Sequence, residues 1–487
     1  MTAKRLDADV VVIGAGPAGA TAAALLAAWG HSVVLVHGES EAPSLAESLP
    51  ASTKKLLKFL GQLDSTEAAS FHPNHGNTSH WAERDGVAST TAAGYHVSRS
   101  AFDGVLREHA RSKGAVMVNA HVRGIEFTSP VVVKCVNEDG TRRCTAQFVL
   151  DCSGRAGVIA RRGLRRTDSR YRTLAVVAEW DTEAWPAGEC THAVVESYDR
   201  GWAWSIPLTA TRRQCTVMID ADRTTVRKSE LERIYGDELR RAAGLTARLA
   251  GARRVGPAWA CDASTYDSVT AFESDSFLVG DAASSVEVLS SGGVKKALSS
   301  AWSAAVVVNT CLTKPGMRSC AASFFDRRER QVHADYVRRS AAFFSEAAAV
   351  YGNDFWDVRA SAASAAASDD DLSDLALLHD SDVRVAFEQL RDAPQLDLAA
   401  GPNLKFADVA TIEGHEVVLR EGVVIPGVTS PVRFAAGLNL PELVRIAPAC
   451  RDIPSLFARY ERRVAPVDPR DLLVALSFLV TRRVLSR

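Results

Sequence analysis

Four histidines are the residues of this sequence best suited to proton transfer, and they lie close together in the chain. His72, His75 and His80 fall within residues 71–81, and His96 follows in the next segment. An unperturbed histidine titrates near pH 6.5, so each could serve as a general base or hydrogen-bond a substrate. A structural histidine in a surface hairpin is the alternative for each. Because no cysteine or carboxylate pattern completes a ligand set, we predict no metal site.

A glycine-rich turn near the N-terminus has the spacing that binds a dinucleotide. The apolar residues 10–13 run directly into a G-x-G-x-x-G motif, and a small-residue helix pattern and a second apolar run, 32–36, follow. This order predicts strand, turn, helix and strand. We expect Gly14 to permit the turn and Gly16 to let the backbone approach a pyrophosphate at the helix N-terminus. Gly19 should let the helix pack closely on the sheet.

The acidic residue that usually binds the ribose in this motif is expected near residue 37, at the end of the second strand. His37 stands there instead, and Glu39 follows two residues later. Glu39 is therefore the candidate for the ribose.

The composition is that of an ordinary soluble globular protein. The chain has 487 residues, 47% hydrophobic and 24% charged, with a formal net charge of −1. A charge so close to zero argues against nucleic acid or an anionic membrane as the main partner. The longest apolar segments, 301–312 and 472–480, are shorter than the roughly 18–20 residues that span a bilayer. Nine cysteines without a C-x-x-C pair, and no signal-peptide pattern, predict a cytoplasmic protein with reduced thiols.

Three motifs, taken in order, resemble those of the FAD-dependent aromatic hydroxylase and halogenase superfamily. They are the glycine turn at 14–19, the segment Asp151-Cys152-Ser153-Gly154-Arg155 after an apolar strand, and the segment Gly280-Asp281-Ala282-Ala283. The likeness covers about residues 8–313 and implies FAD as the cofactor.

The resemblance also implies roles along the cofactor. The first glycine loop would hold the pyrophosphate, Asp281 would bond a ribityl or ribose hydroxyl, and Arg99 would lie along the FAD. A loop at a helix N-terminus would face the flavin pyrimidine, where N–H donors stabilise negative charge on reduced flavin. The residues of that loop are Gly292, Gly293 and Val294.

Within the superfamily, residues 201–207 look like the W-x-W-x-I-P signature of flavin-dependent halogenases. Trp202 and Trp204 carry this likeness, and an aromatic sheet face packed on the core is the alternative. Halogenases also use a lysine to carry hypohalous acid from flavin to substrate. In related enzymes it follows the loop that here reads 71–76, yet no lysine lies between Lys58 and Lys113.

The sequence is more similar to the halogenase-like tryptophan hydroxylases that mature quinone-cofactor enzymes. Segments 47–50, 76–81, 94–99 and 289–299 carry this resemblance, although Glu287-Val288 replaces the usual Asp-Pro. The expected catalytic residues are His72, His75 and His96, from the chemistry of imidazole, and Glu47, from the resemblance alone. The expected substrate-binding residues are Asn74, His80, Trp81, Trp202 and Trp204.

The activity implied by the resemblance is that of an FAD-dependent monooxygenase. Reduced FAD would react with O2 to give a C4a-hydroperoxide, whose distal oxygen is attacked by an electron-rich aromatic ring. The expected substrate is tryptophan or indole, as a small molecule or tethered in a peptide or protein. Halogenation of an indole, pyrrole or phenol, a flavoprotein dehydrogenase or reductase, and a non-catalytic FAD protein stay open. No second nucleotide motif is visible, so NAD(P)H would act directly or through a separate flavin reductase.

The expected architecture is α/β, or α+β overall. It combines a Rossmann-type FAD domain with an inserted antiparallel substrate sheet and a mainly helical C-terminal region. We expect the helical tail to help bind a macromolecule-tethered substrate. The expected boundaries are 1–61, 95–170 and 270–313 for the FAD domain, 62–94 and 171–269 for the sheet domain, and 314–487 for the C-terminal region, with a small module at 372–487.

Overall fold

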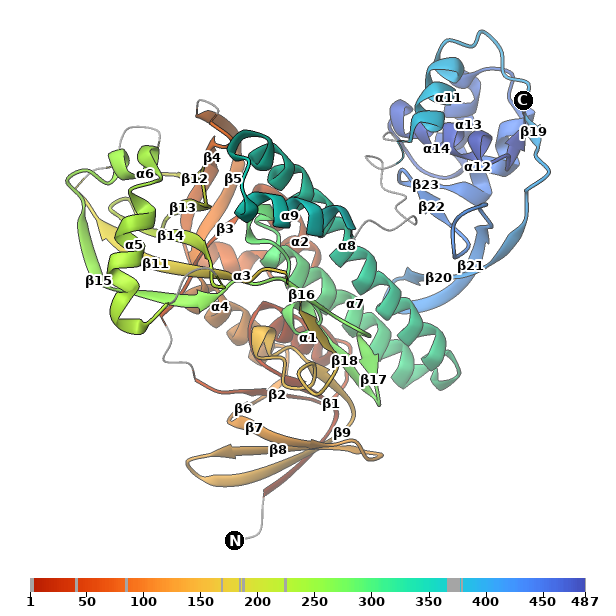
Figure 1. Cartoon of the computed structure of the whole chain (residues 1–487). Helices are drawn as coiled ribbons and strands as arrows, with labels where there is room; N and C mark the ends of the chain where they lie inside the picture. The colour runs from red at the N-terminus through yellow and green to blue at the C-terminus, as the bar shows by residue number, and fades with distance from the viewer. Residues whose placement is uncertain are drawn as a thin grey trace. The chain divides into compact units, whose positions relative to one another are not determined.

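The computed structural model describes residues 4–39, 43–83, 86–167, 170–183, 185, 189–222, 226–365, 377 and 380–486. The chain forms two compact units (Figure 1). Residues 325–365 group with the N-terminal part of the chain. The domain boundaries expected from the sequence stay a prediction. The first unit comprises Met1–Thr313 and Phe325–Ala367, and the second comprises Lys314–Phe324 and Ser368–Arg487.

A Rossmann-type parallel sheet lies at the centre of the first unit, which confirms the expected α/β fold. Its strand order is β17-β18-β9-β1-β2-β6, and all neighbours from β18 to β6 are parallel. Strand β1 is central because residues 10–13 are β-branched and buried, as a strand covered on both faces requires. The bounds are β1 (Lys4–Ile13), β2 (Val33–His37), β6 (Val116–Asn119), β9 (Gly140–Asp151), β17 (Phe272–Glu273) and β18 (Ser276–Leu278), with the hairpin β7 (His121–Glu126) and β8 (Val131–Asn137) beside β9.

Two helices bring their N-terminal turns together above this sheet. Helix α1 (Pro17–Ala28) is built almost wholly of small residues, so it packs closely against α7 (Gly293–Thr313). Gly280, which follows β18, lies between their first turns: a Cβ on it would be 3.1 Å from the Cβ of Ala18 and 3.5 Å from Ala297. The two glycine segments found in the sequence therefore meet at one place.

A second sheet of the first unit has the order β15-β11-β14-β13-β12-β4-β5-β3, and its pairs are antiparallel except β4–β12. Helices α5 and α6 cover one face, while α8 and α9 supply the apolar side chains that pack on the other. The strands are β3 (Ala46–Leu49), β4 (His72–His80), β5 (Val87–Ser98), β11 (Thr173–Asp181), β12 (His192–Tyr198), β13 (Gly201–Pro207), β14 (Arg212–Asp220) and β15 (Arg253–Asp262), and the helices are α4 (Arg99–Ser112), α5 (Leu231–Leu239), α6 (Ala243–Arg248), α8 (Arg318–Tyr351) and α9 (Asp354–Ala365).

The second unit has a core of its own, made mainly of leucine and valine. Its helices begin at side-chain caps, with Asp380, Asn439, Asp452 and Asp468 each accepting a backbone N–H. It contains α11 (Ser381–Arg391), the hairpin β20 (Phe406–Glu413) and β21 (Glu416–Val423), and the helices α12 (Leu440–Ile446), α13 (Ile453–Arg463) and α14 (Pro469–Thr481). Among the described residues of the whole chain, no helix combines the length and apolar character needed to cross a membrane.

Candidate flavin site

The first glycine loop has the geometry of an anion-binding turn. Gly14 has a φ of +97°, and a Cβ on it would lie 2.5 Å from the Cys152 carbonyl oxygen. A Cβ on Gly19 would lie 1.8 Å from the Gly14 oxygen, which shows how closely helix and loop approach. At Gly16 a Cβ would meet nothing closer than 3.7 Å. The first turn of α1 has neither a side-chain cap nor an acidic residue, so its N–H groups suit a pyrophosphate.

Arg99 is the cation beside this loop. Its guanidinium lies 3.9 Å from where a Cβ of Gly16 would be, and it donates from Nε to Asp103 at 3.2 Å. Glu47, on the edge strand β3, lies 3.7 Å from it. Burial raises the pKa of the Glu47 carboxyl, and the attraction of Arg99 opposes that rise. For Arg99, burial lowers the pKa, but Asp103 and Glu47 outweigh it and the net shift is upward.

Asp281 stands in the second glycine segment, and its side chain is about one-third exposed (37%). Its charge acts on both Glu47 and Arg99. Together with the glycine loop beside Arg99, four distant segments of the chain therefore meet at one site. Tyr266 donates to the main-chain oxygen of Asp281 at 2.7 Å and so fixes the turn. Its Oδ1 lies 3.4 Å from Nζ of Lys296. That the partly exposed carboxylate binds a hydroxyl of the cofactor stays a prediction.

The predicted flavin-facing loop precedes α7. Ser291 has a φ of +45°, and a Cβ on Gly292 would collide with the ring of Tyr336 on α8, 2.3 Å away. At Gly293 nothing would lie within 4 Å of a Cβ. The N-terminus of α7 is therefore open on its Gly293 side, while Val294 is buried beneath it. Such an opening at a helix N-terminus fits the electron-rich edge of a flavin.

Glu39, the candidate for the ribose, follows β2 and is exposed. Its Oε1 accepts a hydrogen bond from Nδ2 of Asn119 at 2.9 Å. Nearby His37, at the end of β2, is half-buried, and burial lowers its pKa.

The motif at 151–155 stabilises the turns around the site through hydrogen bonds. Asp151 is fully buried and accepts from the N–H groups of Ser153 and Ile159 at 3.1 and 2.7 Å. Arg155 donates to Ser285 Oγ at 2.6 Å and to Asp262 at 3.0 Å, so it ties this turn to the second glycine segment. These residues are absent from the predicted site because a turn with a structural role and a ligand-binding turn look alike in one sequence.

The predicted histidines cluster around residues 190–191. His72 and His96 contact the main-chain oxygens of Cys190 and Thr191 at 2.7 and 3.0 Å, and the two rings stack at 6.2 Å. His75 lies 3.2 Å from the Thr191 hydroxyl. Burial lowers the pKa of His96 to about 3, so its ring is neutral throughout the physiological range. No group of His, Cys, Asp or Glu suited to hold a metal ion is found in the described part of the chain.

The register of β3 against β5 separates these histidines from Glu47. Glu47 pairs with Val97, and Ser48 pairs with His96. Since consecutive side chains of a strand leave on opposite faces, Glu47 and His96 point away from each other. Glu47 joins Arg99 and Asp281, whereas His96 joins the histidine cluster.

The predicted substrate-binding residues lie on strands β4 and β13 or, for Trp81, directly after β4. Asn74 is buried and its Nδ2 donates to Ser48 Oγ at 2.9 Å, so its amide organises the strand. His80 packs against Gly86. The three tryptophans, by contrast, form one aromatic cluster with the helices α8 and α9. In it, Trp81 is 5% and Trp202 1% exposed, Trp204 is half-buried at a ring distance of 5.3 Å from Trp202, and Trp356 lies 5.5 Å from Trp81.

Two buried ionisable residues beside this cluster are not among the site residues predicted from the sequence. Glu287 precedes the flavin-facing loop, and burial raises its pKa to about 7. Arg359, from α9, lowers that pKa by attraction and lies 3.7 Å from Asp220. The only sequence signal was the replacement of Asp-Pro by Glu287-Val288.

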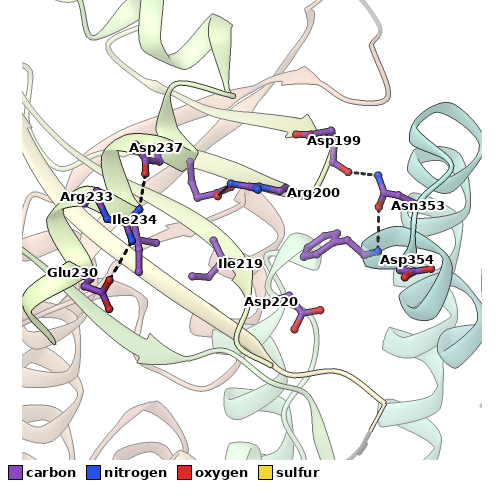
Figure 2. Close-up of a pocket in the computed structure, with 12 residues that line it drawn as sticks. Asp199, Arg200, Ile219, Asp220, Glu230, Arg233, Ile234, Asp237, Asn353 and Asp354 are labelled. Atoms are coloured by element: carbon purple, nitrogen blue, oxygen red, sulfur yellow. Dashed lines mark hydrogen bonds and ion pairs between the residues drawn. The ribbon is translucent and has the colours of Figure 1, made fainter. Parts of the chain in front are cut away.

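A pocket of about 840 Å³ lies elsewhere on the first unit, and none of the predicted FAD residues lines it. Figure 2 shows charged side chains around it that pair with one another. Arg233 bridges Glu230 and Asp237 at 3.3 and 3.0 Å, and Arg200 binds Glu238 at 2.5 Å. These charges are satisfied within the chain, so we assign the pocket no ligand.

The fold and the family model together show a flavin-dependent oxidoreductase of the halogenase-like fold. The family model described as "Tryptophan halogenase" matches residues 52–375, well over half of the chain. The chain therefore belongs to the tryptophan halogenase family, a flavin-dependent enzyme family that uses FAD and O2.

Similar proteins include tryptophan 2-halogenase of Chondromyces crocatus, 28% identical over 337 residues. The match covers 65% of this chain and 64% of that relative. Among solved structures, the flavin-dependent halogenase CmlS has a TM-score of 0.79 at 21% identity, covering 100% of this chain and 96% of that one. The peptidyl tryptophan dihydroxylase QhpG, essential for tryptophylquinone cofactor biogenesis, has a TM-score of 0.67 at 22% identity, with coverages of 98% and 99%. At these identities the two structures support the fold.

Proposed function

We propose that this enzyme is an FAD-dependent monooxygenase that hydroxylates an electron-rich aromatic ring, with tryptophan or indole as the substrate class. The observation that carries the proposal is the lack of a lysine in β4, where halogenases place theirs. Asn74 stands in that strand with its amide bound to Ser48. The buried Lys296, in the first turn of α7, donates to main-chain oxygens of the loop that follows β18, so its ammonium is held inside the protein and away from any substrate.

Bound FAD would supply the oxygen chemistry, and the residues of the chain would hold it and manage a proton. The N–H groups of α1 and the Arg99 guanidinium would bind the pyrophosphate, and Asp281 would accept from a hydroxyl. Hydroxylation of an aromatic carbon releases a ring proton. We assign its acceptance to the Glu47 carboxylate, which lies on the Arg99 side of β3, on the face opposite the histidine cluster. The aromatic cluster around Trp204 would exclude water from the ring.

A tethered substrate is the second part of the proposal. The similarity to a peptidyl tryptophan dihydroxylase extends over 98% of this chain, so it includes the second unit. We propose that this unit contacts the peptide or protein that carries the aromatic ring.

Product analysis tests the reaction. The protein would be supplied with FAD, NADH, a flavin reductase, chloride, bromide and ¹⁸O2, and offered free tryptophan, indole and a tryptophan-containing peptide. We expect a product with one labelled oxygen, formed from the peptide faster than from free tryptophan. Omission of the reductase shows whether NAD(P)H acts directly. The R99A variant serves as the flavin-deficient control.

Halogenation is the alternative, favoured by the family itself and by the tryptophan 2-halogenase relative. A product with the chlorine or bromine isotope pattern, dependent on halide, would replace the hydroxylase proposal. An oxidised product without the ¹⁸O label would instead indicate a flavoprotein dehydrogenase or reductase.

A further inference from the structure

Lys296, in the first turn of α7, is a lysine whose side chain has no exposed surface. Its Nζ donates to the main-chain oxygens of Gly280 at 3.0 Å and Ser284 at 2.5 Å. It also lies 3.4 Å from Oδ1 of Asp281. An ammonium has three N–H groups, and all three face the loop that follows β18. One buried side chain thus ties the second glycine segment to helix α7.

The surroundings of Lys296 balance its charge. A buried ammonium is destabilising unless it is paired and hydrogen-bonded. Asp281 supplies a carboxylate on one side, and Glu329, buried on α8, supplies another. Burial raises the pKa of Glu329, while the attraction of Lys296 opposes that rise. Lys296 therefore interacts with two acidic groups, of which Glu329 is buried and Asp281 is partly exposed.

The loop that Lys296 holds is itself part of that site. Gly280 lies between the first turns of α1 and α7, so a shift of the loop would displace both helix N-termini. Asp281 also interacts with Arg99 and Glu47 through its charge. Removing the positive charge of Lys296 would enlarge the excess of carboxylates at the site, leaving Glu47, Asp103 and Asp281 around one arginine.

We propose that Lys296 is a positioning residue for FAD. Through its hydrogen bonds it holds Asp281 and the loop 280–284 in the position that binds oxidised FAD. Its positive charge also offsets the negative charge of Asp281, so that the site can bind reduced flavin, which is more negatively charged. The inference rests on the proposed flavin site. It goes further because it assigns part of the reduction potential of the bound flavin to a residue that does not touch the cofactor.

The neighbouring lysine provides a matched control. Lys295 lies in the same turn of α7 but is exposed, with Nζ 3.5 Å from Ser52 Oγ. The variants K296M and K295M remove the same charge one residue apart. We expect K296M to bind oxidised FAD about tenfold more weakly, as for the loss of one charge-assisted contact. The reduction potential of its bound flavin should also shift to a more negative value. K295M should match the wild type in both measurements.

The potential separates this role from a purely structural one. Equal FAD affinity and equal potential in K296M and the wild type would overturn the proposal, as would a weaker affinity with an unchanged potential. If K296M does not fold, D281N and K296R provide the test. D281N removes the carboxylate that Lys296 offsets and should raise the potential, whereas K296R keeps the charge and should leave it near the wild-type value. An unchanged potential in D281N would overturn the inference. If the wild type binds no FAD, the proposed function fails first.

Discussion

The guanidinium of Arg99 lies 3.7 Å from the carboxylate of Glu47, and this contact joins the start of α4 to the edge strand β3 of the second sheet. It thereby links the Rossmann part of the first unit to the sheet that carries the aromatic cluster. Arg99 also approaches Gly16, so one side chain connects the pyrophosphate loop with the candidate proton acceptor. Substitutions of Arg99 should therefore lower the affinity for FAD more than they lower the stability of the protein.

Replacement of Arg99 by alanine should weaken FAD binding about 10- to 100-fold, because a charge-assisted hydrogen bond contributes roughly 1.5–3 kcal/mol. Quenching of flavin fluorescence on titration measures the dissociation constant. The variant R111A is the control: Arg111 lies on the same helix, but it is exposed and pairs with Glu108. Comparable losses in both variants would show that the helix, and not the guanidinium of Arg99, determines binding.

Alanine at Gly16 and at Gly19 should affect different properties: the first should weaken FAD binding, and the second should lower the stability of the protein. A methyl group at Gly16 has room, so G16A should unfold within about 0.5 kcal/mol of the wild type yet bind FAD poorly, since the methyl occupies the pyrophosphate position. A methyl at Gly19 would collide with the Gly14 oxygen, so G19A should lose stability even without FAD. Urea unfolding of the apoproteins and flavin titration check both effects. Normal FAD binding by G16A would place the pyrophosphate elsewhere.

The glycine turn and the second glycine segment were predictable because their roles depend on local backbone geometry. A tight turn, a close helix approach and a helix N-terminus each depend on a few residues that are neighbours in the sequence. The aromatic cluster was not predictable in the same way. Trp81 donates to the Phe343 oxygen, and Trp202 packs near Trp356, so their burial depends on α8 and α9, which lie far along the chain.

The surroundings of Glu47, His96, Lys295 and Lys296 could not be predicted from the sequence, because they depend on strand register and on the rotation of a helix about its axis. Glu47 and His96 come from similar polar segments, but the register of β3 against β5 sends them to opposite faces. No short-range pattern predicts a register between segments about fifty residues apart. Lys295 and Lys296 are equivalent in the sequence, and only the rotation of α7 on the sheet decides which of them is buried.

Truncation of the two signature tryptophans should separate packing from substrate contact. Trp202 is 1% exposed, so W202A should lose about 3–5 kcal/mol of stability, as is typical for a large core residue. W204A should lose less, because Trp204 is half-buried, and should raise KM for the aromatic substrate. Urea unfolding and steady-state kinetics provide the two measurements. Equal stability losses with an unchanged KM would indicate that Trp204 also belongs only to the core.

Glutamine at Glu47 and at His96 tests which face of the sheet is catalytic. We expect E47Q to lower kcat by about 10²- to 10⁴-fold, the usual contribution of a general base. H96Q should change kcat only a few-fold, since burial holds the pKa of His96 near 3 and its ring contacts the Thr191 oxygen. FAD affinity, measured in parallel, ensures that E47Q is compared at full occupancy. A severe loss in H96Q with normal kcat in E47Q would move the active face to the histidine cluster.

Glu287 should make stability fall as pH rises. Its pKa is raised by burial from 4.5 to about 7, so between these values the folded protein binds a proton that the unfolded chain has released. The stability linked to that proton is complete below pH 4.5 and is lost as pH rises through 7. A shift of this size corresponds to roughly 3 kcal/mol at most. Arg359 keeps Asp220 as a partner in E287Q, at 3.7 Å, so the variant should fold. Urea unfolding from pH 5 to 8 should therefore show E287Q gaining stability relative to the wild type, and parallel profiles would mean that the carboxyl of Glu287 is already charged at pH 5.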